Sequence, residues 1–195
     1  HGFRRALGHG GIATAGRLIG ALILNKTIAL LGGPTSLAAF GQIQNLIVAG
    51  SALTGAALSN GTTSISASQE RDAQRETLSE ARRLSLQGSL ILLPLLLFTP
   101  LLLHELLPSI GNSILLSLLL ALAIFATGQI QLALALLNAQ RRLGAWSSLQ
   151  LISALIQPIA AFIGFQQGGI AAALAAFLLS NILPLFLLAI RTWSP

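Results

Sequence analysis

Cysteine and methionine are absent from this sequence of 195 residues, and charged residues are scarce. Without cysteine the chain has neither disulfides nor thiolate ligands for a metal. Charged residues make up 8% of the chain, whereas a soluble domain averages about 25%. The sequence also lacks an acidic cluster for a divalent metal, an H-E-x-x-H motif, a G-x-S-x-G motif and a Walker motif. We therefore predict no metal site, no cofactor and no enzyme activity.

Apolar residues are abundant instead. They make up 54% of the chain, and the mean hydropathy is +0.80. A membrane-spanning helix needs roughly 20 apolar residues, and the sequence contains about six runs of that length. The absent initiator methionine and the end just after the last run predict that this sequence is part of a longer protein. We predict an all-α integral membrane protein with six transmembrane helices, at residues 12–31, 36–58, 84–103, 113–137, 145–165 and 170–190.

The arginines between the predicted spans indicate the orientation. Nine arginines lie on one side of the predicted membrane, and the three loops on the other side contain no Lys or Arg. This asymmetry predicts that both ends of the segment are cytoplasmic. The net charge of +6 is spread thinly over these loops, so it indicates topology and not a nucleic-acid surface. The nine residues are Arg4, Arg5, Arg71, Arg75, Arg82, Arg83, Arg141, Arg142 and Arg191.

Two cations lie inside the first predicted span, and no predicted span contains a carboxylate to pair with them. Lys26 lies about 6 Å from the middle of its span, at 1.5 Å rise per residue, where a charged lysine costs about 2.5–3.5 kcal/mol. It is either a ligand for an anionic headgroup, or it snorkels, is neutral or bonds to backbone carbonyls. Arg17 lies nine residues earlier, on roughly the opposite helical face. Its position favours snorkelling to lipid phosphates over ligand binding.

Side-chain amides accompany these cations. Gln42 and Asn45 share a helical face, and Gln42 should lie near the depth of Lys26 because the first two spans are antiparallel. We therefore predict a substrate-binding cluster of Lys26, Gln42 and Asn45, with Asn25 and Arg17 as further candidates. The alternative is a set of interhelical hydrogen bonds with no ligand. Other polar or proline interruptions are typical either of helices broken around a cavity or of simple kinks; they are Gln129, Gln131, Gln150, Gln157, Pro158, Asn181 and Pro184.

Several residues between positions 16 and 61 carry a likeness to a known family. They are Lys26, the turn Leu31-Gly32-Gly33-Pro34, Leu37, Phe40-Gly41-Gln42, Asn45-Leu46, Gly55 and Asn60-Gly61. With these residues the stretch resembles the start of bacterial polysaccharide flippases of the Wzx type, in the MOP exporter superfamily. The likeness is closest to the O-antigen and enterobacterial common antigen branch. The charged segment 60–83 and the basic turn after the fourth span fall where this family places them.

The resemblance implies that the six spans form one lobe, the amino-terminal one, of a MOP-type transporter whose two lobes face each other across a cationic cavity. It implies a flippase of the bacterial inner membrane. Such a protein moves undecaprenyl-diphosphate-linked oligosaccharide from the cytoplasmic to the periplasmic leaflet by alternating access. Lys26 would be a cavity residue, whereas Arg17 matches no motif of the family. The implied partners are the lipid-linked oligosaccharide, membrane lipids and components of glycan polymerases, with no nucleic acid.

Three other interpretations stay open. A multidrug or cation-coupled antiporter of the same superfamily would be favoured by carboxylates within the membrane, and the predicted spans contain none. A non-transporting scaffold for glycan assembly would tolerate replacement of Lys26 by alanine but not loss of the whole protein. A membrane glycosyltransferase would need an acidic metal site, which the sequence lacks.

Overall fold

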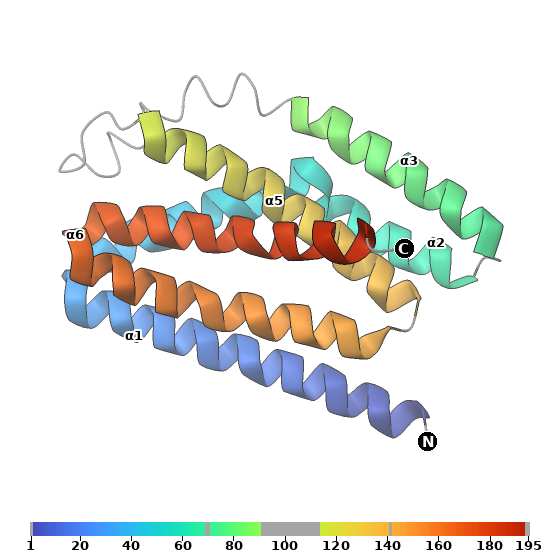
Figure 1. Ribbon diagram of the computed structural model, residues 1–195, viewed down its shortest axis with the longest axis horizontal. Coiled ribbons are helices and arrows are strands. Elements are labelled where there is room, and N and C mark those ends of the chain that lie inside the picture. The colour runs from blue at the N-terminus through green and yellow to red at the C-terminus, as the bar shows by residue number, and fades with distance from the viewer. Residues whose placement is uncertain (1, 69–70, 91–113, 141, 194–195) are drawn as a thin grey trace.

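The computed structural model describes residues 2–68, 71–90, 114–140 and 142–193, and nearly all of these residues are helical. The prediction of an all-α protein is therefore confirmed for this part of the chain. Figure 1 shows the arrangement of the helices. In chain order they are α1 (Gly2–Ser51), the π-helix η1 (Ala52–Ala56), α2 (Ala57–Ser68), α3 (Arg71–Leu90), α5 (Ile114–Ala139) and α6 (Leu143–Trp193).

Two of these helices are hairpins. The backbone of α1 leaves the helical region at Gly33 (φ 74°), directly before Pro34, and α6 is broken at Gly168 and Gly169 (φ 66°). Glycine adopts such positive φ values without steric cost. Figure 1 shows that each of these two helices doubles back at its break, so that α1 and α6 each contribute two antiparallel arms. Both breaks lie at turns that the sequence predicted.

Three helical stretches of the described residues are long and apolar enough to cross a membrane: Gly10–Ile65, Ile114–Ala139 and Leu143–Leu185. Their outward faces carry bare apolar side chains, among them Leu22 (68% exposed) and Leu30 (73% exposed). Surfaces of this kind are costly in water and suit lipid, so the helices indicate a membrane-embedded protein. The third predicted span, 84–103, lies outside the described residues beyond position 90, and the number of six spans stays a prediction.

The main hydrophobic core lies at the end of the bundle where both hairpins turn. Phe40 packs against Phe165 (ring centroids 6.1 Å apart) and against the edge of Phe177 (5.5 Å). Leu24, Leu120 and other buried aliphatic side chains surround these rings. This core closes the bundle at the turn end, so any internal space must open elsewhere.

The first arm of α1 approaches the first arm of α6 closely because it carries small residues. A Cβ atom at Gly16 would overlap the Leu151 side chain, and one at Gly20 would overlap the carbonyl group of Ala154. The G-xxx-G spacing of Gly16 and Gly20 favours close helix packing, and the structure shows this contact. The contact constrains the position of Arg17, which directly follows Gly16.

The second arm of α1 ends in a break that the sequence did not indicate. The predicted span 36–58 was expected to be one uninterrupted helix, but the α-helix gives way to η1 at Ala52. Within η1 the backbone at Gly55 has φ 136°. A π-helical turn places its carbonyls out of the ordinary register with later amide groups, so this break needs hydrogen-bond partners from neighbouring helices.

Candidate binding cavity

A cavity of about 540 Å³ lies between the arms of α1, α5 and the arms of α6. The core residues Leu24 and Phe177 line it toward the turn end. Exposed lining residues from both arms of α1, Leu18, Asn45 and Val48 among them, mark its open side. The volume falls within the range of about 300–1,000 Å³ that small-molecule sites have.

The lining of this cavity mixes polar and apolar side chains, although the bundle is largely apolar. Eleven of its twenty-one lining residues carry polar side chains. Arg17 is the only charged residue among them, and no lining residue is acidic. The polar residues are Thr14, Arg17, Gln44, Asn45, Thr127, Gln131, Gln150, Ser153, Gln157, Ser180 and Asn181.

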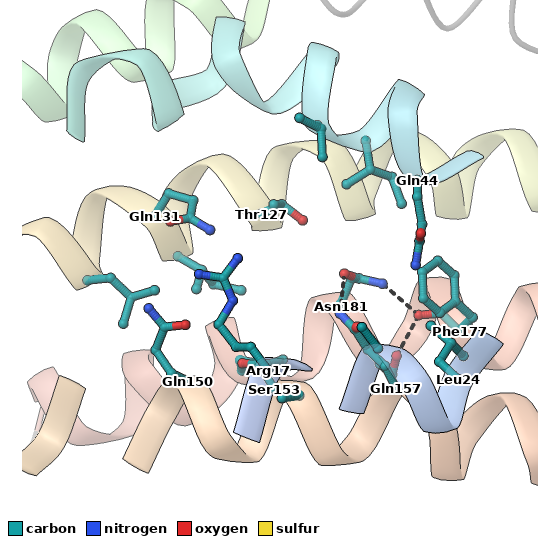
Figure 2. Close-up of a pocket in the computed structure, with 18 of the residues that line it drawn as sticks. Arg17, Leu24, Gln44, Thr127, Gln131, Gln150, Ser153, Gln157, Phe177 and Asn181 are labelled. Carbon is teal, nitrogen blue, oxygen red and sulfur yellow. Dashed lines mark hydrogen bonds between the residues drawn. The ribbon is translucent and has the colours of Figure 1, made fainter. Parts of the chain in front are cut away.

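One end of the cavity, here called the arginine end, is formed by Arg17, Gln131 and Gln150. Figure 2 shows the Arg17 side chain extending from α1 toward Gln131 on α5 and Gln150 on α6. Among the described residues, none of these three side chains makes a hydrogen bond or an ion pair. A guanidinium has five N–H donors and no acceptor. The arginine end therefore holds one uncommitted positive charge flanked by uncommitted amides.

The other end, here called the amide end, contains Gln44, Gln157 and Asn181. Gln157 Nε2 donates to Asn181 Oδ1 (3.0 Å), and Asn181 Nδ2 donates to the carbonyl oxygen of Phe177 (2.8 Å). Both bonds are drawn dashed in Figure 2, and the first of them joins the two arms of α6. The Gln44 side chain points toward the same region from the second arm of α1. This end carries no charge.

The structure brings two of the five predicted binding residues to the cavity. Arg17 and Asn45 line it, whereas Lys26, Asn25 and Gln42 lie outside its lining, and all five residues are exposed. The expected cluster of Lys26, Gln42 and Asn45 does not form around this space. The reason is helical geometry: nine residues separate the two cations, which is about half a turn of rotation at 3.6 residues per turn. The binding roles of all five residues stay predictions.

Residues that the sequence marked only as polar interruptions supply part of the remaining lining. Gln131, Gln150, Gln157 and Asn181 all face the cavity. Gln44 was not singled out from the sequence. Its spacing in the sequence could have indicated this position, because Gln44 lies three residues from Ile47 and four from Val48 and so shares a helical face with them. All three side chains line the cavity.

A second polar cluster, here called the Thr54 node, lies outside the cavity and joins η1, α3 and α5. Ser85 Oγ and Gln129 Nε2 (3.1 Å) both donate to the Thr54 carbonyl oxygen. Gln129 Nε2 also donates to Ser85 Oγ (2.6 Å), and Thr54 Oγ1 donates to the Ile124 carbonyl oxygen (3.2 Å). Thr54 and Ser85 are both 0% exposed. The node supplies the donors that the break at η1 needs.

Comparison with protein-family models, with curated proteins and with solved structures finds no match to this chain.

Proposed function

We propose that this protein is a flippase that moves an undecaprenyl-diphosphate-linked oligosaccharide from the cytoplasmic to the periplasmic leaflet. The observation that carries the proposal is the uncommitted guanidinium of Arg17 in an amide-lined cavity between apolar helices. A charge within a membrane span that has no partner is costly. An anionic ligand that supplies the missing partner would offset this cost.

The chemistry of the cavity suits each part of such a lipid. A guanidinium binds phosphate oxygens with two parallel hydrogen bonds, which assigns the diphosphate to Arg17. Side-chain amides both donate and accept hydrogen bonds, as sugar hydroxyl groups require. The open side of the cavity lies beside the apolar residues Leu18 and Val48, so the polyprenyl chain can stay in lipid. No covalent step is needed.

The proposed setting is the bacterial inner membrane, with the protein crossing it several times. The asymmetry of the arginines supports cytoplasmic ends. In this arrangement the described bundle belongs to one lobe of a MOP-type transporter, and the lipid changes leaflet when that lobe rocks against a second one. Membrane lipids and glycan polymerase components would be its neighbours.

The rival transport function, multidrug or cation-coupled antiport, has less support. Its substrates or coupling ions are cations, which carboxylates bind, and the cavity lining contains an arginine and no acid. The scaffold interpretation does not account for an uncommitted cation in a lined cavity. It is distinguished by experiment, because a scaffold tolerates replacement of that cation.

The test is complementation of a strain that lacks the gene. Mass spectrometry measures the lipid-linked oligosaccharide, and labelling of the exposed glycan on spheroplasts shows in which leaflet it lies. Arg17→Ala should reduce export about tenfold or more, because hydrogen bonds to charged groups contribute about 1.5–3 kcal/mol. Arg17→Lys should retain part of the activity. Lys26→Ala is the matched comparison: a binding role for Lys26 predicts a comparable loss of export, whereas its position outside the cavity lining predicts a change of less than twofold.

The outcomes separate the interpretations. An unchanged lipid-linked pool in the deletion strain overturns the oligosaccharide assignment. Loss of export with Lys26→Ala but not with Arg17→Ala would place the anion outside the cavity and overturn the role of Arg17. Full export with both variants, together with loss on deletion, would favour the scaffold.

A further inference from the structure

Two prolines free two backbone carbonyls at the cavity. Pro158 lies in the first arm of α6 and Pro184 in the second. Proline has no N–H group, so the carbonyls four residues earlier lose their usual helical donor. Those carbonyls belong to Ala154 and Ser180, and both residues line the cavity. No side chain of the described residues donates to either carbonyl. The Ala154 carbonyl lies against Gly20 in the close contact between α1 and α6, so only the Ser180 carbonyl is left as a further backbone acceptor.

The amide end has hydrogen-bonding capacity left over. After the bond from Gln157 to Asn181 and the bond from Asn181 to Phe177, each of the two amides keeps one free N–H, and Gln157 keeps its oxygen. Gln44 makes no hydrogen bond among the described residues, so its whole amide is free. Donors and acceptors thus lie side by side, without a formal charge.

The two ends of the cavity lie at different depths. At 1.5 Å rise per residue, Gln44, Gln157 and Asn181 lie about 16–18 Å from the glycine turns of their hairpins. By the same measure Arg17 and Gln150 lie about 24–27 Å from those turns. A ligand that spans the cavity therefore meets a cationic region at one end and a neutral region roughly 8 Å further toward the turns.

We propose that the amide end is a subsite for neutral sugar hydroxyl groups, which orients the lipid with its diphosphate at Arg17 and its first sugar toward the turns. This inference rests on the proposed function. A hydroxyl group donates and accepts at once, and the amide end supplies both kinds of partner. A phosphate oxygen only accepts, so it cannot use the acceptor oxygens of the Gln44 and Gln157 amides, whereas a hydroxyl group can donate to them.

The experiment compares two probes on the purified full-length protein in lipid nanodiscs, by titration of binding. One probe is a short-chain polyprenyl diphosphate, and the other is the same lipid carrying one N-acetylhexosamine. Gln44→Leu and Gln157→Leu should each weaken binding of the sugar-bearing probe about three- to tenfold, as expected for the loss of one or two neutral hydrogen bonds. Binding of the bare probe should not change. Arg17→Ala should weaken binding of both probes.

One control variant keeps the result interpretable. Gln166→Leu removes an exposed amide near the α6 turn, outside the cavity lining, and should leave both affinities unchanged. Gln44→Leu is the decisive variant because it breaks no hydrogen bond of the described residues, whereas Gln157→Leu also removes the tie between the arms of α6.

The possible negative results distinguish failure of the sugar subsite from failure of the proposed function. Equal affinity of the wild type for both probes, or loss of bare-probe binding in Gln44→Leu, overturns the sugar subsite and leaves the anion site standing. If the wild type binds neither probe, the proposed function itself fails. If the effect of Gln44→Leu appears only in NaCl and disappears in KCl at the same ionic strength, the amide end binds a cation and the sugar assignment is wrong.

Discussion

The Thr54 node and the arginine end of the cavity are both polar clusters inside an apolar bundle, but their hydrogen bonds differ. In the node, Thr54 and Ser85 are fully buried and every donor is directed at an acceptor of the protein. In the arginine end, Arg17 and Gln131 are exposed to the cavity and have no partner among the described residues. A polar group that the protein satisfies internally contributes to the fold, whereas one left unsatisfied is available to a ligand.

Two glycines allow the node to form. A Cβ at Gly128 would overlap the hydroxyl of Thr54, and one at Gly55 would lie 2.8 Å from Ser85 Oγ. Gly55 also has φ 136°, a conformation that side chains disfavour. The close approach of α5 to η1 therefore depends on bare backbone at both positions.

The largest expected effect follows from filling that close contact. Gly128→Val would force α5 away from Thr54 and break the node, at a cost of about 3 kcal/mol, or roughly 6–12 °C in the unfolding temperature. Gly61→Val is the matched control, since a Cβ at Gly61 meets nothing within 4 Å. Thermal unfolding in detergent, followed by fluorescence-detected size exclusion, measures both. Equal stability of the two variants would show that the node does not hold η1 in place.

Much of the fold could be predicted from the sequence because its causes are local. Long apolar runs predicted helices, and glycine at positions 33 and 169 marked the two hairpin turns, where the backbone needs positive φ. The spacing of Gly16 and Gly20 predicted a close helix contact without naming the partner helix. In each case the residues that determine the feature lie within a few positions of one another.

The node and the identity of the cavity cation could not be predicted, because both depend on residues far apart in the chain. The break at η1 is stabilised by Ser85 and Gln129, which are 31 and 75 residues from Thr54. Depth in the span favoured Lys26 as the ligand. Which cation lines the cavity depends instead on the face of the helix, and Arg17 lies on the face that meets α5 and α6. A sequence gives the angle between two cations but not the direction of the neighbouring helices.

A smaller effect separates two glutamines that are almost adjacent. Gln129→Leu removes two hydrogen bonds of the node and should destabilise the protein by about 1–2 kcal/mol, within the upper range for buried polar contacts between membrane helices. Gln131→Leu removes no hydrogen bond of the described residues and should change stability by less than about 0.5 kcal/mol.

For ligand affinity we expect the opposite ranking of the two variants, with the larger effect for Gln131→Leu. Gln131→Leu should weaken binding of a short-chain polyprenyl diphosphate about threefold, the equivalent of one neutral hydrogen bond, while Gln129→Leu should leave the affinity of the folded fraction unchanged. Titration of the purified variants measures this. If Gln129→Leu weakens binding and Gln131→Leu does not, the division into a structural and a binding cluster is wrong.

The smallest effect concerns two threonines. Thr54 Oγ1 donates to the carbonyls of Ile124 and Ser51, both at 3.2 Å, whereas Thr127 lines the cavity and makes no hydrogen bond among the described residues. Valine has nearly the shape of threonine, so each substitution removes little besides the hydroxyl group. Thr54→Val leaves the Ile124 carbonyl still bonded within its own helix, and we therefore expect only about 0.6 kcal/mol of destabilisation, the average for such contacts in membrane proteins. Thr127→Val should cost nothing measurable in the same unfolding assay. A larger cost for Thr127→Val than for Thr54→Val would mean that the cavity wall, and not the node, holds the helices together.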